Sequence, residues 1–113
     1  MKPSSFCALS TYGCHNELFG LLLSLSLHHP NEKMYCLVDT KTKKAIESYT
    51  PKIKLNIIWL VTLDKYTGMN RKQMETKGIW SDFQMQKAVI IDETLKYEKD
   101  TLFLDADILI LDK

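Results

Sequence analysis

Residues 101–113, TLFLDADILILDK, contain a run from 102 to 111 that is apolar except for the carboxylates of Asp105 and Asp107. The apolar residues are typical of a buried β-strand, where an acidic side chain needs a partner for its charge. Side chains two apart on a strand point the same way, so Asp105 and Asp107 are expected to point together. A divalent cation with oxygen ligands would relieve their repulsion. Alternatively, one acid caps a turn and the other lies in solvent.

Strand-like and helix-like segments alternate along the chain. Apolar and β-branched residues predict strands over 4–11, 33–40, 53–61 and 101–111. Helical spacing and stop signals predict helices over 14–28, 41–49 and 81–97. This order predicts an α/β fold with a Rossmann-like, mostly parallel sheet, forming one domain over residues 1–113.

Residues 62–78 separate the third predicted strand from the last predicted helix. Their Lys, Asn, Thr and Gly content predicts a polar loop. Ser81 and Gln84 have the spacing of a capping box that would open the helix. Trp80, just before it, is expected to serve packing.

Composition and charge disfavour several classes of protein. The formal net charge of +1 gives no electrostatic reason to expect nucleic-acid binding. The apolar segment Leu18–Leu27 is about half as long as a membrane span, so none is expected. The three cysteines lack the spacing of a zinc ribbon or a disulfide framework, which favours reduced thiols in a cytoplasmic protein.

Three stretches resemble one family. LFLDADILIL (102–111) resembles the hhhDxDhhh motif of nucleotide-sugar-dependent glycosyltransferases with the GT-A fold, closest to the family 8-like group of glycogenin and the lipopolysaccharide galactosyltransferases. ALSTYGCHNELFGLLLSLSLHHP (8–30) resembles that family's opening strand, nucleotide-facing turn and helix. FQMQKAVIIDETLKYEKDTLFLDADILIL (83–111) resembles its lysine-bearing helix and DxD strand. The middle of the chain, 40–78, is the least distinctive part.

The resemblance implies a donor site for a nucleotide-diphospho-sugar, foremost a UDP-sugar. Asp105 and Asp107 would hold Mn²⁺ or Mg²⁺ on the donor diphosphate, with Asp105 also near the ribose. Ser10, Thr11 and Tyr12 would contact the base and ribose, although simple packing is the alternative for Tyr12. The implied reaction is sugar transfer to an acceptor hydroxyl, with the metal neutralising the leaving diphosphate. The acceptor and the catalytic residue stay unknown.

Lys87 and Asp39 are further candidates. Lys87 shares a helical face with apolar residues, and in the family a lysine of this helix lies near the nucleotide or sugar. Its ammonium either extends to water or reaches a phosphate or a strand carboxylate. Asp39 ends another predicted strand and is a looser candidate for contact with the nucleotide.

The length of the chain limits the expected function. A GT-A domain needs roughly twice as many residues, so the chain is expected to be the nucleotide-binding half, truncated after the DxD strand. The edge of its last strand would be open to self-association.

Two other functions stay open. A non-catalytic nucleotide-binding module would bind the nucleotide without turnover. A phosphohydrolase of the haloacid-dehalogenase type also carries a hydrophobic-DxD motif, with its first Asp as nucleophile, but on its first strand.

Overall fold

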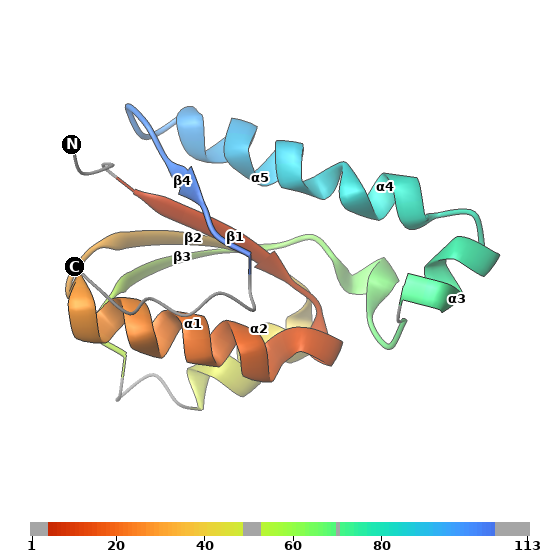
Figure 1. Cartoon of the computed structure of the whole chain (residues 1–113), viewed down its shortest axis with the longest axis horizontal. Helices are drawn as coiled ribbons and strands as arrows, with labels where there is room; N and C mark the ends of the chain where they lie inside the picture. Colours follow the sequence, from red (N-terminus) through yellow and green to blue (C-terminus); the bar gives the residue numbers. More distant parts are fainter. Residues whose placement is uncertain (1–4, 49–52, 70, 106–113) are drawn as a thin grey trace.

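The computed structural model describes residues 5–48, 53–69 and 71–105 and contains a four-stranded, fully parallel sheet (Figure 1). The strands are β1 (Phe6–Ser10), β2 (Lys33–Val38), β3 (Asn56–Val61) and β4 (Leu102–Phe103). Their order is β3-β2-β1-β4. The chain therefore moves outward from β1 to β3 and then returns to the other side of β1. The predicted parallel α/β sheet is confirmed.

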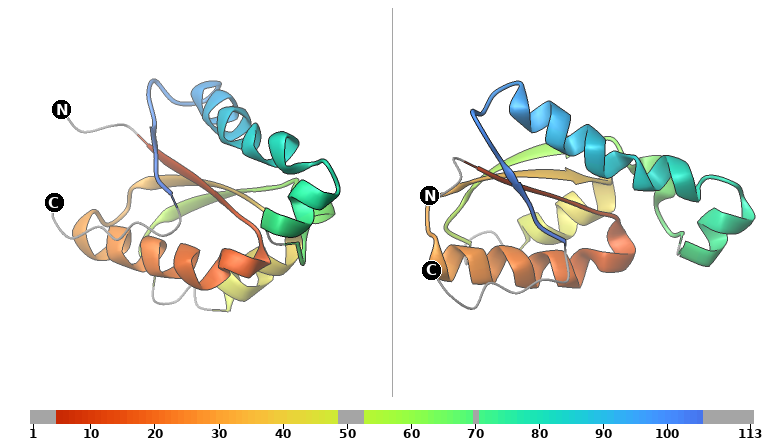
Figure 2. Two further views of the ribbon diagram at one scale, coloured as in Figure 1. Left: turned by 45° about the vertical axis from the view of Figure 1, so that its right-hand side comes forward. Right: turned by 45° about the horizontal axis from the view of Figure 1, so that its top comes forward.

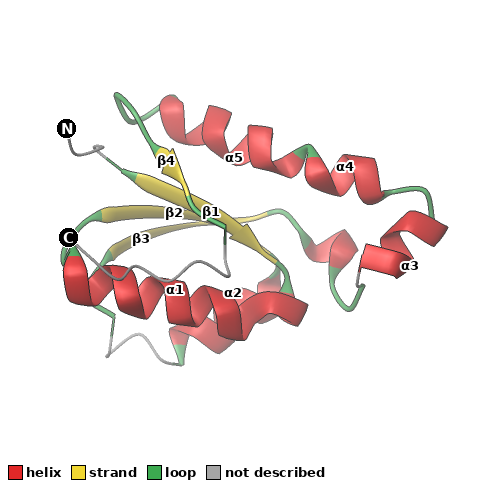
Figure 3. Ribbon diagram, in the orientation of Figure 1, coloured by secondary structure: helices red, strands yellow, loops and turns green. Residues whose placement is uncertain are grey.

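Helices cover both faces of the sheet (Figures 2 and 3). One face carries α1 (His15–His28) and α2 (Thr40–Glu47). The other face carries α4 (Trp80–Gln84) and α5 (Gln86–Leu95). Shorter helices in the described connections are η1 (Tyr12–Cys14), η3 (Asp64–Tyr66) and α3 (Arg71–Thr76). Within the described ranges, no helix has the length and apolar character needed to cross a membrane.

The first core layer lies between the sheet and α1. The leucine stripe of α1 is completely buried: Leu18, Leu21, Leu22 and Leu25. It packs with alternate residues of the two central strands: Phe6, Ala8, Met34, Cys36 and Val38. Because side chains alternate along a strand, the residues between them enter the opposite layer.

The second core layer lies under α5. Its strand residues include Cys7, Tyr35 and Leu37, which pack with Ile90 of α5 and Tyr66 of η3. Strands β1 and β2 are thus buried on both faces, as expected of central parallel strands. The edge strand β3 is only partly buried along most of its length.

The structure corrects the prediction for residues 62–78. This segment contains η3 and α3 as well as turns. Leu63, Tyr66 and Met74 are buried in the second core layer, so three apolar anchors organise a segment whose other residues are mostly polar. Arg71 and Glu75 of α3 also form an ion pair of 2.9 Å across one helical turn.

The boundaries of the last predicted helix and strand also differ. The helical segment begins at Trp80, and no side chain caps it, so the predicted capping box of Ser81 and Gln84 is wrong. Met85 marks the junction between α4 and α5. Only two residues of the last predicted strand form β4, and residues 106–111 of that prediction lie outside the described residues.

Substitution of a buried leucine of α1 tests the packing of the first core layer. We expect Leu22→Ala to lower the free energy of unfolding by about 2–5 kcal/mol, because it opens a cavity in a completely buried layer. Leu27, on the same helix, is 71% exposed, so Leu27→Ala should cost about 0.5 kcal/mol or less. Urea denaturation measures both values. Equal losses in the two variants would contradict this arrangement.

Candidate functional site

Polar side chains gather at the carboxyl edge of the sheet. Because the strands are parallel, their carboxyl ends meet at one edge, where ligands bind in open α/β sheets. The residues that follow the four strands there are Thr11, Asp39, Thr62 and Leu104, with Asp64 and Asp105 shortly after. This edge contains all the predicted site residues that the structure describes apart from Lys87, which reaches it from α5.

Asp39 is the buried centre of this edge. Its Oδ1 accepts a hydrogen bond from the backbone N–H of Thr42 at 3.0 Å and thereby caps α2. Its Oδ2 accepts from the backbone N–H of Tyr12 at 3.2 Å and from the Thr67 hydroxyl at 2.6 Å. One carboxylate therefore connects the turn after β1, the start of α2 and the loop after η3.

The environment of Asp39 keeps it charged. Burial by itself would raise the pKa of this carboxyl, but hydrogen bonds from Thr42, Thr67 and Tyr12 outweigh burial and hold the pKa below its ordinary value of 3.8. The side chain is completely buried. Its role is therefore to position the neighbouring loops, and the looser expectation of direct nucleotide contact does not fit its burial.

The turn after β1 holds the first group of predicted residues. Ser10 is buried, and its hydroxyl donates to the backbone carbonyl of Thr11 at 2.9 Å. The Ser10 hydroxyl therefore makes its hydrogen bond within the turn. The Tyr12 side chain is 40% exposed. Its ring stacks on His15, with centroids 4.2 Å apart, and the Lys41 ammonium lies 5.7 Å from the Tyr12 centroid. Tyr12 is thus a partly exposed aromatic surface beside a positive charge.

A pocket of about 430 Å³ opens next to this turn. Its lining includes Thr11, Tyr12 and Gly13 of the turn together with Arg71, Trp80 and Phe83. These last three residues belong to α3 and α4, helices that follow the sheet's third strand. The pocket therefore exists only because the segment after β3 folds back toward the end of β1.

The side chains that α3 and α4 contribute to the lining form a stack. The Arg71 guanidinium carbon lies 4.9 Å from the Trp80 ring centroid, a cation–π contact. Trp80 stacks on Phe83, with centroids 5.7 Å apart. From the sequence, Trp80 is expected to serve packing alone, and Arg71 is not among the predicted site residues, because residues 62–78 are predicted to form a loop. The i, i+3 spacing of Trp80 and Phe83 is the sequence signal that could have placed both on one helical face.

Asp105 and Lys87 form a second group on the same edge. Leu104 donates its backbone N–H to Cys7 at 2.9 Å and holds the chain along β1 after β4. Continued from the pairing of Cys7 with Phe103, this register places Asp105 beside Leu9. The Lys87 ammonium lies 3.5 Å from Asp105 Oδ1, so Lys87 makes one of its expected contacts, that with a strand carboxylate.

The ion pair is open to solvent. The side chains of Lys87 and Asp105 are 56% and 54% exposed, which limits the contribution of such a pair to stability to about 1 kcal/mol at most. The ammonium also lies 5.5 Å from the Phe103 ring centroid. A carboxylate with this exposure is accessible to a cation from solvent, and its oxygens suit Mg²⁺ or Mn²⁺.

The two groups are adjacent but distinct. Phe83 lines the pocket, and Lys87 follows it by about one helical turn, although neither Lys87 nor Asp105 belongs to the pocket lining. Asp107, the second predicted metal ligand, lies outside the described residues. Within the described part of the chain, no cluster of three or more His, Cys, Asp or Glu side chains is arranged to hold a metal ion.

Comparisons of the chain with protein-family models, with curated proteins and with solved structures found no match. The side chains at the carboxyl edge are therefore the basis for inferring a function.

Asp39 generates a prediction with a defined pH dependence. We expect Asp39→Asn to lower the free energy of unfolding by about 1–3 kcal/mol at pH 7, because a buried charged acceptor of three hydrogen bonds is lost. The depressed pKa stabilises the folded state above about pH 3.8, and this contribution is lost as the pH falls through the folded-state value. The difference between wild type and Asp39→Asn should therefore shrink from pH 7 to pH 3 in urea titrations.

The matched control for this experiment is Asp92→Asn, which removes an exposed carboxylate of α5. Its difference from wild type should stay near zero at pH 7. A difference between wild type and Asp39→Asn that grows toward low pH would contradict the assignment of Asp39 as a buried carboxylate.

Proposed function

We propose that the carboxyl edge of this sheet binds a nucleotide-diphospho-sugar donor together with Mn²⁺ or Mg²⁺, as part of a glycosyltransferase with the GT-A fold. The observation that carries the proposal is the position of Asp105. Asp105 comes shortly after β4 and lies next to β1, at the point where the strand order reverses. In open parallel sheets this point is where ligands bind.

The pocket beside the β1 turn supports the nucleoside part of the proposal. Its volume of about 430 Å³ lies in the usual range for small-molecule sites. Tyr12 and Trp80 offer aromatic surfaces for a base, while the Thr11 hydroxyl and the Arg71 guanidinium are polar groups of the lining. An apolar site with a few polar groups suits a nucleoside better than it suits a free sugar.

The Lys87–Asp105 pair supports the diphosphate part of the proposal. A metal held by Asp105 and Asp107 would neutralise the charge on the leaving nucleoside diphosphate. Asp105 Oδ1 faces the Lys87 ammonium at 3.5 Å, so a metal cation at this oxygen would compete with the ammonium. Lys87 would then be available to a phosphate oxygen. In this proposal Lys87 binds and positions the donor.

The position of the acids argues against the phosphohydrolase alternative. That mechanism needs its nucleophilic Asp on the first strand, whereas β1 has the sequence FCALS and no acid. Asp105 instead follows β4, the last of the described strands. A non-catalytic nucleotide-binding module shares the binding step and differs only in turnover.

Calorimetry with UDP and GDP tests the donor site. We expect binding that requires Mn²⁺ and that weakens at least about tenfold in Asp105→Asn, because a carboxylate ligand of the metal is lost. Asp107→Asn should behave in the same way. Asp92→Asn removes an equal charge from the exposed surface of α5 and should bind like wild type.

Two assays then distinguish the alternatives. Release of UDP from a UDP-sugar in the presence of Mn²⁺ indicates a transferase site, and metal-dependent binding without release indicates a binding module. Hydrolysis of a phosphate monoester would support the phosphohydrolase instead. Wild-type protein that is folded by circular dichroism but binds neither nucleotide would overturn the donor-site proposal.

A further inference from the structure

The outer edge of β3 is a row of backbone groups that no other described strand pairs. β3 ends the strand order and pairs along its whole length with β2. Parallel strands use alternate residues for each neighbour. Asn56 donates its N–H to Glu32 and Thr62 donates to Val38, so residues 56, 58, 60 and 62 face β2. The N–H and C=O groups of Ile57, Trp59 and Val61 therefore face outward.

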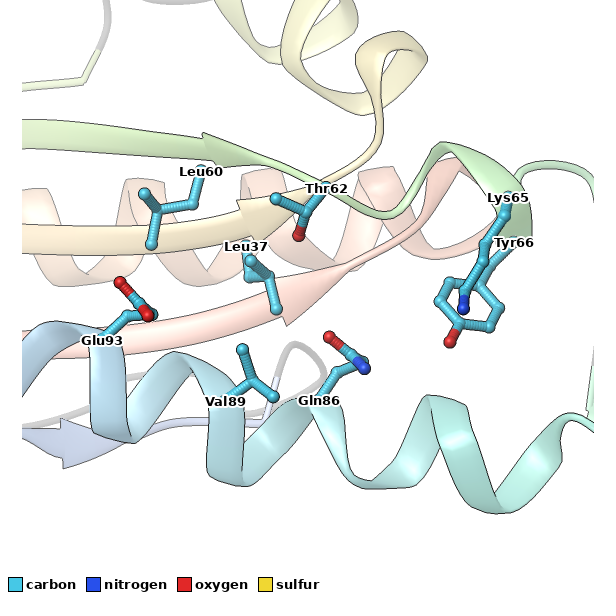
Figure 4. Close-up of a pocket in the computed structure, with 8 residues that line it drawn as sticks. All are labelled: Leu37, Leu60, Thr62, Lys65, Tyr66, Gln86, Val89 and Glu93. Atoms are coloured by element: carbon cyan, nitrogen blue, oxygen red, sulfur yellow. The ribbon is translucent and has the colours of Figure 1, made fainter.

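This edge lacks the features that commonly block strand pairing. The sequence of β3, NIIWLV, contains no charged residue and no proline. Val61 is 38% exposed. Beside the edge, Leu60, Leu37 and Val89 help to line a hollow of about 420 Å³ between the sheet and α5 (Figure 4). Apolar surface thus continues from the edge strand onto the neighbouring face of the sheet.

We propose that the β3 edges of two copies of this chain pair antiparallel to form a twofold-symmetric dimer. A twofold contact joins the same edge of both copies and makes the two strands antiparallel. With the axis at Trp59, Ile57 faces the partner's Val61, and the two Trp59 residues face each other. These are the residues whose backbone groups point outward, so the three facing pairs form about six hydrogen bonds.

Side chains at the strand and at its ends fit the same register. Ile58 lies opposite the partner's Leu60 on the α5 side, an apolar cross-strand pair. Lys54 precedes β3 and Asp64 follows it, and both are exposed. The Asp64 carboxylate accepts hydrogen bonds from the backbone N–H and the hydroxyl of Thr40, at 2.6 and 2.8 Å, so it has partners within its own copy. The antiparallel register adds a longer-range attraction, because it brings Lys54 of one copy toward Asp64 of the other, whereas a parallel register would bring like charges together.

The proposed dimer differs from the self-association expected from the sequence. That expectation used the edge of the last strand, but β4 contributes only two paired residues. Pairing of β3 with β4 of another copy would join different edges and extend into an open chain of copies. The antiparallel β3 contact joins the same edge of both copies, so the assembly is complete with two copies. It also lies at the opposite end of the strand order from Asp105, so it leaves the proposed donor site accessible.

Sedimentation velocity of the full chain, from about 1 to 300 µM, tests the dimer. We expect the wild-type mass to rise toward twice that of one chain and to stop there. Val61→Pro removes an outward N–H and leaves the bonds between β3 and β2 intact, because residue 61 does not donate to β2. We expect this variant to weaken dimerisation at least about tenfold. Val61→Thr keeps the N–H and the β-branched shape, and should dimerise like wild type.

Circular dichroism checks that each variant is folded. If Val61→Pro does not fold, Val61→Glu keeps the backbone donor and places a charge at the partner's Ile57, and should weaken the dimer by a similar factor. A wild-type protein that stays monomeric at 300 µM overturns the proposal. So does a mass that grows beyond two copies, or a folded Val61 variant with either substitution that dimerises as tightly as wild type.

Discussion

The carboxylate of Asp39 is the interaction on which the carboxyl edge depends. A completely buried charge is costly, and here donors from three segments of the chain compensate it. The same hydrogen bonds hold the turn after β1, the first turn of α2 and the loop after η3 at fixed positions. Since Tyr12 and the segment after η3 both contribute to the pocket lining, Asp39 holds two parts of that lining in place.

Asp105 contrasts with Asp39, although both follow a strand of the same sheet. Asp39 receives its hydrogen bonds from neutral groups and is closed to solvent. Asp105 faces one ammonium at 3.5 Å and is about half exposed. In a weak, solvent-screened ion pair, another cation can easily replace the ammonium. A buried carboxylate whose hydrogen bonds are already made is not open to such an exchange. This difference is the physical reason why Asp39 is described as a positioning residue and why, of these two residues, ligand binding is proposed for Asp105 alone.

The parallel sheet also separates the two proposed activities in space. Its central strands are buried on both faces, so the surfaces left for interaction are the carboxyl edge and the outer strands. The proposed donor site uses the junction of β1 and β4, where the strand order reverses. The proposed dimer uses β3 at the far end. Because the two sites share no residue, loss of one activity by substitution should leave the other measurable.

The features that depend on local periodicity could be predicted from the amino-acid sequence. The leucine spacing of α1 and the alternation of the four strands with α1, α2 and the α4–α5 segment were predictable, because neighbours along the chain create these patterns. The helices η3 and α3 were not predicted. Other features became visible only in the folded chain: Leu63, Tyr66 and Met74 anchor a mostly polar segment, Arg71 and Trp80 line the same pocket as Tyr12, and Asp105 is the contact that Lys87 makes among those expected for it. These contacts join residues far apart in the chain, whose pairing depends on how the helices pack onto the sheet and leaves no periodic signal in the sequence.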